Sequence, residues 1–300
     1  MSTTTTEIAR FAFVRPDDVA GAVAAGAAAG QGGRFWAGGT DLMLEWQRKQ
    51  RSIETSIDIT RLSELRGIDV GPSEIRIGAL TTLAEIERAA AVHPDLETLA
   101  AIAAVMCTPQ TRTLATVAGN LCNASPAADL APVLMVLGAR ITTLTAEGGR
   151  ELELEDLFAA PKQSVLADGE LLTHITIPLG GRRAVRYGRI ARTVVDIALT
   201  LSACALTLDD QGRIITARIA FGSVAPTPLR APSGEQLLVG KTLAELTPEL
   251  LAEAATAAAG DANPIDDIRT SAAYRRHAIR VLTQRALTEA VAQLSVGGDQ

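Results

Sequence analysis

The sequence predicts an α+β fold in two parts, a larger domain over residues 1–178 and a smaller one over residues 179–300. The 300 residues are enough for about two domains with cores of their own. Short strand-like runs alternate with alanine-rich helical stretches as far as Pro178, and strand signals restart after the glycine pair Gly180–Gly181. We therefore place the boundary between the two domains next to this pair.

The first 55 or so residues predict a small strand–helix–strand unit, followed by a second helix. The expected elements are a strand at Phe11–Val14, a helix opened by Pro16, Asp17 and Asp18 that stops by Gly30–Gly33, a strand at Arg34–Ala37 and a helix at Asp41–Arg48. The glycines of this unit do not follow a strand in GxGxxG spacing, so a Rossmann fold is not indicated.

Residues 56–178 predict a second subdomain of the larger domain. The expected strands are Ile57–Ile59, Glu74–Ile77, Arg140–Thr145, Glu151–Leu154 and Leu171–Ile177. A capping box at Thr82–Glu85 starts one helix, a second runs over Pro94–Met106, and Pro126 starts a third.

The second domain predicts a three-stranded antiparallel sheet with a helical bundle. Strands at Ile197–Leu208 and Arg213–Phe221 flank Asp209–Gly212, which has the composition of a hairpin turn. Thr247 and Pro248 have the residue types of a cap and first helical turn, and the final helix is expected over Ala272–Leu294.

Composition excludes several classes of protein. The net charge of −6 argues against a nucleic-acid partner, which requires clustered Lys and Arg. The threonine-rich stretch Met1–Arg10 lacks the apolar segment of a secretory signal, and runs such as Leu130–Ala139 are too short to span a membrane. The three cysteines are too irregularly spaced for a metal or iron–sulfur site. We expect a cytoplasmic protein.

The stretch Thr116–Leu130 has the composition of a ligand-binding loop. Small residues, hydroxyls and amides precede an apolar run opened by Pro126, an order suited to bare backbone N–H groups that meet an anion at a helix entrance. An ordinary polar connection has the same composition.

A second glycine-bearing turn supports the ligand hypothesis. In Phe35–Leu42 a short apolar run ends in Gly38 and Gly39, followed by a hydroxyl and a carboxylate that can cap the next helix. Two strand-to-helix turns of this kind can close on opposite ends of one pyrophosphate.

Together these motifs resemble the FAD-binding medium subunit of the molybdenum hydroxylases, a family that includes bacterial xanthine dehydrogenases, carbon monoxide dehydrogenase and N-heterocycle dehydrogenases. The motifs are Ala37-Gly-Gly-Thr-Asp-Leu42, the block Thr116-x-x-Gly-Asn-Leu-x-Asn-Ala-Ser-Pro-x-x-Asp-Leu130, Glu170-Leu-Leu172 and Phe221–Pro228. The resemblance implies a two-part FAD-binding domain of the vanillyl-alcohol-oxidase/PCMH type, with subdomains of about 1–55 and 56–178.

The resemblance also implies a set of cofactor-binding residues. These are Ala37, Gly38, Gly39, Thr40, Asp41 and Leu42 in the first loop, Thr116, Val117, Ala118, Gly119 and Asn120 in the second, Asp129 and Leu172. Glycine in the first loop would let main-chain amides approach the pyrophosphate. Asp129 would accept a hydrogen bond from a cofactor hydroxyl, or only interact with a helix dipole. Leu172 would lie against the isoalloxazine, or be an ordinary core leucine.

In function the resemblance implies an electron-transfer subunit without catalytic residues or a metal of its own. A large partner subunit would oxidise the substrate at a molybdenum cofactor, and a small one would bring electrons through two [2Fe-2S] clusters to the FAD, within a dimer of heterotrimers. An external acceptor would then receive the electrons. The alternatives are a self-contained FAD-dependent oxidoreductase of the same fold and a flavin-free structural subunit.

Two positions depart from the family pattern. Ala118 stands where relatives usually have glycine, which is tolerable if its φ is negative. Gly188 stands where many relatives carry a lysine, before the Arg192 and Asp196 that match the family's Arg-x-x-x-Asp. A role for that lysine at the flavin is not expected here.

Overall fold

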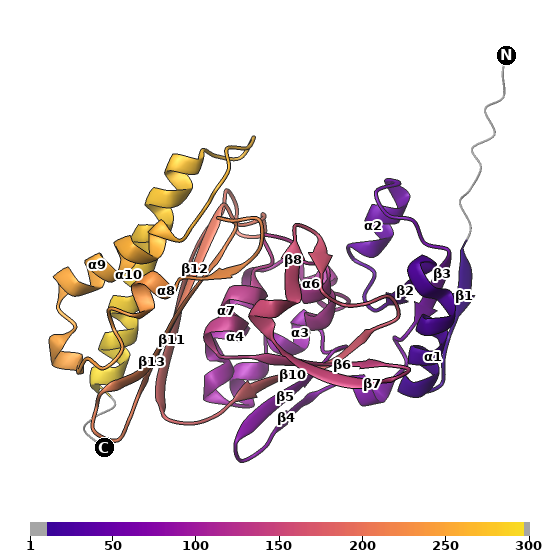
Figure 1. The fold of residues 1–300 in the computed structure, drawn as a ribbon, viewed down its shortest axis with the longest axis horizontal. Helices are drawn as coiled ribbons and strands as arrows, with labels where there is room; N and C mark the ends of the chain where they lie inside the picture. The colour runs from indigo at the N-terminus through magenta and orange to yellow at the C-terminus, as the bar shows by residue number, and fades with distance from the viewer. Residues whose placement is uncertain (1–10, 297–300) are drawn as a thin grey trace.

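The computed structural model describes residues 11–296 and contains three main sheets arranged along its length (Figure 1). The prediction that Met1–Arg10 is not a secretory signal lies outside the described residues. None of the helices between residues 11 and 296 has both the length and the apolar character needed to cross a membrane.

The first sheet is parallel and lies at one end of the molecule, with strand order β1-β3-β2 (Figure 1). Its elements are β1 (Ala12–Val14), α1 (Val19–Ala29), β2 (Gly33–Trp36), α2 (Leu42–Gln47) and β3 (Thr55–Asp58). Asp18 caps α1 by accepting a hydrogen bond from the N–H of Gly21. The predicted strand–helix–strand unit is therefore present, but the strand expected at Ile57–Ile59 in the second subdomain is β3, which lies between β1 and β2 in this first sheet.

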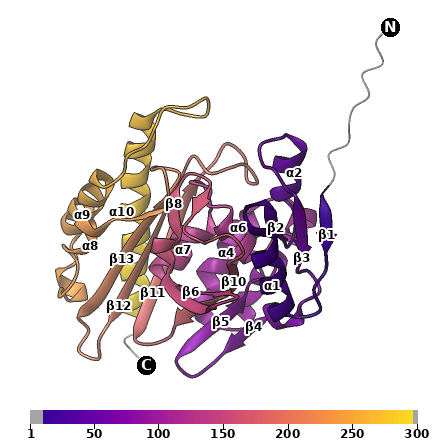
Figure 2. The ribbon, with the colours of Figure 1, turned by 45° about the vertical axis from the view of Figure 1, so that its right-hand side comes forward.

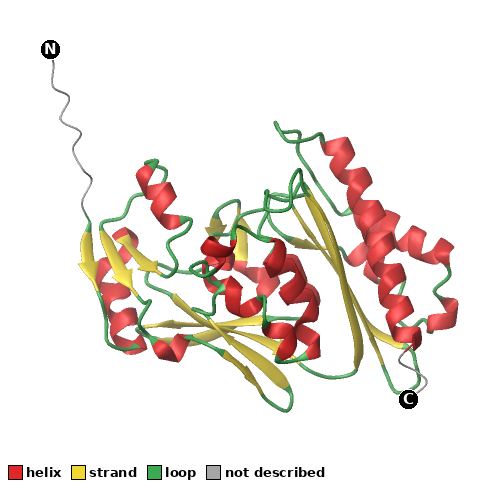
Figure 3. Ribbon diagram, turned by 180° about the vertical axis from the view of Figure 1, so that it is seen from behind, coloured by secondary structure: helices red, strands yellow, loops and turns green. Residues whose placement is uncertain are grey.

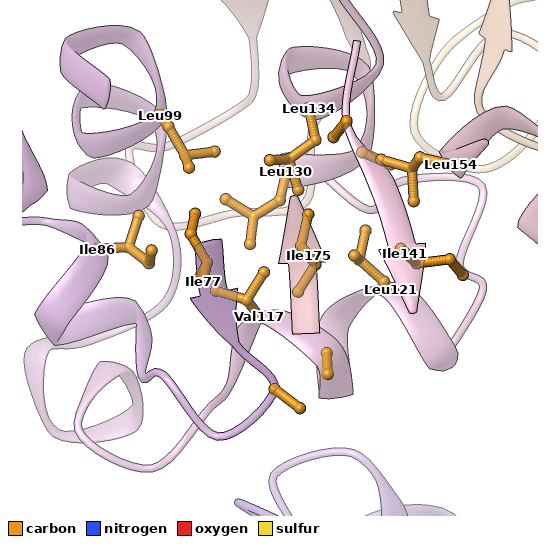
Figure 4. Close-up of a cluster of buried hydrophobic side chains, with 14 of the residues drawn as sticks. Ile77, Ile86, Leu99, Val117, Leu121, Leu130, Leu134, Ile141, Leu154 and Ile175 are labelled. Carbon is orange, nitrogen blue, oxygen red and sulfur yellow. The ribbon is translucent and has the colours of Figure 1, made fainter. Parts of the chain in front are cut away.

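The second sheet is antiparallel, with strand order β4-β5-β10-β6-β7. Its strands are β4 (Ile68–Val70), β5 (Glu74–Gly78), β6 (Arg140–Thr145), β7 (Gly148–Glu153) and β10 (Leu171–Pro178). Its helices are α3 (Leu83–Ile86), α4 (Glu97–Val105), α5 (Pro109–Arg112), α6 (Val117–Cys122) and α7 (Leu130–Val136). Isoleucines of the central strands, including Ile77 and Ile175, pack against Leu130 and Leu134 of α7 (Figure 4). A small hairpin, β8 (Phe158–Ala160) and β9 (Gln163–Ser164), precedes β10.

The third sheet is antiparallel, with strand order β11-β12-β13-β14. Its elements are β11 (Arg182–Ile190), β12 (Thr200–Leu208), β13 (Ile214–Gly222), β14 (Leu229–Arg230), α8 (Pro232–Glu235), α9 (Pro248–Gly260) and α10 (Ala272–Val296). Helices α9 and α10 cover one face (Figure 3). Helices α4 and α7 pack on the other, so Ala203 and Ala205 of β12 belong to the first core whereas Cys204 and Leu206 belong to a second.

The family fold class is confirmed, with local differences from the sequence prediction. The third sheet has a fourth strand, the two-residue β14. Helix α7 begins at Leu130 rather than at Pro126, because the carbonyl of Pro126 accepts a hydrogen bond from the N–H of Ser223 and residues 125–129 form turns. Strand β7 ends at Glu153 rather than at the predicted Leu154, because Leu154–Leu157 forms a 3-10 turn.

Candidate functional site

A pocket lies between the first sheet and the second, and its walls come from the two predicted loops. All of the predicted site residues line it except Val117 and Asp129. The predicted residues in the lining are Ala37, Gly38, Gly39, Thr40, Asp41, Leu42, Thr116, Ala118, Gly119, Asn120 and Leu172. Segments about eighty residues apart in the sequence thus meet at one site; Figure 2 shows α2, which follows the first loop, and α6, whose first turn consists of residues of the second loop.

The glycines of the first loop are required by contacts within the protein. A Cβ on Gly38 would lie 1.9 Å from the carbonyl oxygen of Leu114. Gly39 has a φ of +68°, and its Cβ would lie 2.6 Å from the ring of Trp36. The expectation that glycine serves to let a phosphate approach is therefore incomplete, since these Cβ positions face Leu114 and Trp36.

The backbone donors of the first loop are available to a ligand. The N–H groups of Gly38, Gly39, Thr40 and Asp41 donate to no acceptor within residues 11–296. Asp41 precedes α2, yet its side chain forms no cap hydrogen bond, contrary to the predicted cap. Gly38, Gly39 and Thr40 are half-buried and Asp41 is exposed, so these four donors, which have no partner within residues 11–296, are open to water or to an anionic ligand in the pocket.

The second loop differs from the first because the N–H groups of Val117, Ala118, Gly119 and Asn120 already have acceptors, and only that of Thr116 has none within residues 11–296. Thr116 is the N-cap of α6, and its hydroxyl accepts a hydrogen bond from the N–H of Gly119 at 3.1 Å. The N–H of Val117 donates to the carbonyl of Thr81, and that of Asn120 to the carbonyl of Thr116. Apart from that of Thr116, the predicted bare N–H groups are thus absent from this helix start within the described residues, and the helix follows α5 and its turn rather than a strand.

Side chains of the second loop provide a different kind of group. The Oδ1 atom of Asn120 is buried and has no hydrogen-bond partner among the described residues. An unsatisfied buried acceptor in a pocket lining is costly unless a ligand donates to it. The φ of Ala118 is not positive, so alanine fits where relatives usually have glycine.

The two predicted residues outside the pocket lining are buried. Val117 is fully buried in the core. The Asp129 carboxylate is 7% exposed and pairs with Arg189 of β11 at 3.0 Å. Burial raises the pKa of Asp129, and the guanidinium of Arg189 opposes that shift. The role of Asp129 toward a cofactor hydroxyl stays a prediction.

At Gly188, where many relatives carry a lysine, the backbone packs against α10. A Cβ on Gly188 would lie 2.8 Å from a methyl carbon of Leu282. The next residue, Arg189, is committed to Asp129 and to the carbonyls of Val194 and Asp196. Any longer side chain at position 188 would have to displace Leu282.

One end of the pocket is lined by charged residues that the sequence reading did not single out. Arg34, Glu45 and Arg51 line it, and Glu45 pairs with Arg51 at 2.8 Å. Burial, and then the charge of Arg51, lower the pKa of Arg34. Glu45 and Arg51 follow the first loop closely in the sequence, and this nearness was the only signal that could have placed them in the pocket. Their charges alone do not distinguish them from solvated helix residues.

Buried groups near Leu172 complete the lining. Glu170 lines the pocket and pairs with Arg150 at 2.7 Å. Cys122 lies in the wall, and burial raises the pKa of its thiol to about 12, so it is an inert thiol. The described residues contain no group of three or more His, Cys, Asp and Glu side chains placed to hold a metal ion.

Comparisons with known proteins identify the family to which the sequence is similar. The family model described as the FAD binding domain in molybdopterin dehydrogenase matches residues 9–180, and the model of the CO dehydrogenase flavoprotein C-terminal domain matches residues 186–290. The 6-hydroxypseudooxynicotine dehydrogenase complex subunit alpha of Paenarthrobacter nicotinovorans is 31% identical over 284 residues, which are 94% of each chain. The carbon monoxide dehydrogenase medium chain of Afipia carboxidovorans is 30% identical over 94% of this chain and 97% of its own.

The fold comparison gives the same result. A solved structure of carbon monoxide dehydrogenase from Hydrogenophaga pseudoflava matches with a TM-score of 0.89 at 29% identity, covering 95% of this chain and 98% of that one. This chain therefore belongs to the FAD-binding proteins of the molybdopterin dehydrogenases. Within that class it is a medium subunit of the molybdenum hydroxylase family, and hence part of an oxidoreductase.

Proposed function

We propose that this chain is the electron-transfer subunit of a heteromeric molybdenum hydroxylase, and that it passes electrons from the [2Fe-2S] clusters of a partner subunit to an external acceptor. The observation that carries the proposal is the row of free N–H groups at Gly38, Gly39, Thr40 and Asp41 in the pocket wall. Such a row suits the dianionic pyrophosphate of FAD.

The other residues of the pocket fit the rest of the cofactor. The unpaired Oδ1 of Asn120 would accept a hydrogen bond from a cofactor hydroxyl or amine. Leu172, which is 3% exposed, would provide an apolar surface for a ring, as the family resemblance implies. Bound FAD supplies one- and two-electron redox chemistry, and the residues of this chain orient it and keep it in a largely apolar pocket.

The proposed partners follow from the relatives. Relatives are named as a medium chain or as a subunit of a complex, which supports a large molybdenum-cofactor subunit and a small [2Fe-2S] subunit, assembled as a dimer of heterotrimers. We further propose that residues 1–178 and 179–300 are the two domains of the chain, and that it works in the cytoplasm.

Purified full-length protein tests this function. We expect it to take up FAD stoichiometrically, to show flavin absorbance, and to oxidise no organic substrate until it is joined to its partners. Turnover of a substrate by the isolated chain would instead favour a self-contained oxidoreductase. A colourless chain that takes up no added FAD would favour a structural subunit. Molybdenum and iron that co-purify with the chain would support the proposed partners.

A further inference from the structure

Residues 158–170, here called the strap, cross one end of the pocket. The strap contains the β8–β9 hairpin and the loop that leads into β10, and its Leu166 and Glu170 line the pocket. The N–H of Lys162 donates to the carbonyl of Ala124, two residues beyond α6, at 2.8 Å. At the other end of the strap, a Cβ on Gly169 would lie 2.7 Å from the backbone of Gly26 in α1. The strap therefore contacts the elements on both sides of the pocket.

Lys162 joins these two sides through its side chain. Its ammonium group donates to Oε1 of Glu45 in α2 at 2.9 Å and to Oδ1 of Asn123 at 2.9 Å. Asn123 is the C-cap of α6. Helix α2 follows the first loop of the pocket and α6 begins in the second, so Lys162 connects the first turn of α2 with the C-terminal end of α6, and its partners Glu45 and Asn123 both line the pocket.

Helix α2 depends on such polar contacts for its position. None of its residues is fully buried, and besides the contact of Trp46 with Phe11 it is held by polar contacts such as those of Glu45 with Arg51 and Lys162. Burial acts to raise the pKa of Glu45, but the hydrogen bond and charge of Lys162, together with Arg51, hold that pKa below its ordinary value. Lys162 itself has a φ of +63°, a backbone conformation that a lysine keeps only when surrounding contacts maintain it.

We propose that Lys162 is a latch that holds α2 against α6 and so controls how fast FAD leaves the pocket. This inference rests on the proposed function, because it concerns the cofactor of the same site. The Lys162 side chain is 44% exposed, so salt screens its interaction with Glu45. The latch can therefore open without unfolding of the chain, and cofactor release becomes sensitive to ionic strength.

Release kinetics of Lys162→Met test the latch. FAD-loaded full-length protein is diluted, and the fluorescence of released FAD is followed at low and high salt. At low salt we expect release about two- to fivefold faster than in the wild type, the range for loss of one exposed ion pair. Release from the wild type accelerates with salt, whereas release from the variant does not. The control is Lys241→Met, at a half-buried lysine beside the Leu243–Glu245 turn that lies outside the pocket lining, and its release should equal that of the wild type.

Glu45→Gln removes the charge on the other side of the latch. It should accelerate release in the wild-type background and accelerate it less in the Lys162→Met background, because the Lys162–Glu45 pair is lost in both variants, whereas the Glu45–Arg51 pair is lost only with Glu45. It also provides the test if Lys162→Met does not fold. Equal low-salt release rates in the wild type and the charge-neutralised variants would refute the latch and leave the proposed function intact. Failure of the wild type to take up FAD would refute the proposed function and the latch with it.

Discussion

FAD binding and the stability of the FAD-free protein are expected to respond in opposite ways to a change at Asn120. Its buried Oδ1 has no partner among residues 11–296, so this part of the chain without ligand bears the cost of an unsatisfied acceptor. We expect Asn120→Leu, which removes the acceptor at similar volume, to raise the free energy of unfolding of the FAD-free protein by about 1 kcal/mol. The same change should weaken FAD binding about tenfold. Urea unfolding and FAD titration measure the two effects.

Thr200→Val is the matched control for Asn120→Leu. The hydroxyl of Thr200 is also buried and unpaired, but it lies at the start of β12 and outside the pocket lining. Its removal should raise stability and leave FAD affinity unchanged. Wild-type FAD affinity in Asn120→Leu would show that Asn120 does not contact the cofactor.

For single residues, the sequence indicates which positions lie in the pocket wall more readily than which contacts require a given residue type there. The pair Gly38 and Gly39 was predictable as a site, yet the atoms that exclude a Cβ belong to Leu114 and Trp36. The partner of Asp129 is Arg189 in another sheet. Contacts between residues so far apart in the chain depend on the packing of whole elements, which a single sequence does not specify.

Helix α10 is attached to the third sheet by a buried arginine and one carboxylate. Arg275 is 2% exposed, donates to the carbonyls of Leu199 and Ser223, and pairs with Asp267 at 2.9 Å. Burial acts to raise the pKa of Asp267, but hydrogen bonds from Arg269, the backbone and Arg275 hold it well below its ordinary value. The ionised form of Asp267 is therefore favoured in the folded state.

Asp267→Asn should destabilise the protein in a pH-dependent way. A lowered folded-state pKa contributes stability that is complete above the unfolded-state pKa, about 4, and is lost as the pH falls through the folded-state value. At pH 7 we expect a loss of about 2 kcal/mol, because buried Arg275 loses its counter-charge. The gap between variant and wild type should close as the pH falls below about 4.

Urea unfolding between pH 3 and 7 measures this effect, with Asp210→Asn in the exposed β12–β13 turn as the control. The control should behave as the wild type throughout. A gap between Asp267→Asn and the wild type that stays constant over this range would mean that the ionisation of Asp267 does not stabilise the fold.

Local signals predicted element boundaries where the chemistry is local. The capping box at Thr82 and the cap at Thr247 are both present. The start of α7 was misplaced because Pro126, a good first-turn residue, is instead held in a turn by its hydrogen bond from Ser223. The hydrogen bond from Ser223, the residue after β13, thus overrides the preference of Pro126 for the first turn of a helix.

At the scale of the molecule, the third sheet belongs to both cores. Val185, Leu201, Ala203, Ala205 and Ala220 pack in the same core as the second sheet, while their strand neighbours pack under α9 and α10. We therefore expect the protein to unfold in a single cooperative transition, with calorimetric and van't Hoff enthalpies that agree. Two resolved heat-capacity peaks would mean that residues 1–178 and 179–300 unfold independently.

The sequence predicted the order of most of the longer elements better than the way they share a core, although it named no strand at β4 or β11. Strand β12 is buried on both faces along most of its length, so it reads as a continuous apolar run without the alternation that identifies a face. The division into two parts was visible from restarted strand signals after Gly180–Gly181. The sharing of Ala203 and Ala205 with the first core was not.

The contact of Gly26 with Gly169 has a practical consequence. A methyl group added at Gly26 would meet the backbone of Gly169 at 3.0 Å and the ring of Phe35 at 2.7 Å, and so would act as a wedge between the strap and α1. Neither glycine lines the pocket. The pair is therefore a site at which a small substitution would separate the strap from α1, and because Phe35 lines the pocket the same wedge would also act on the pocket wall.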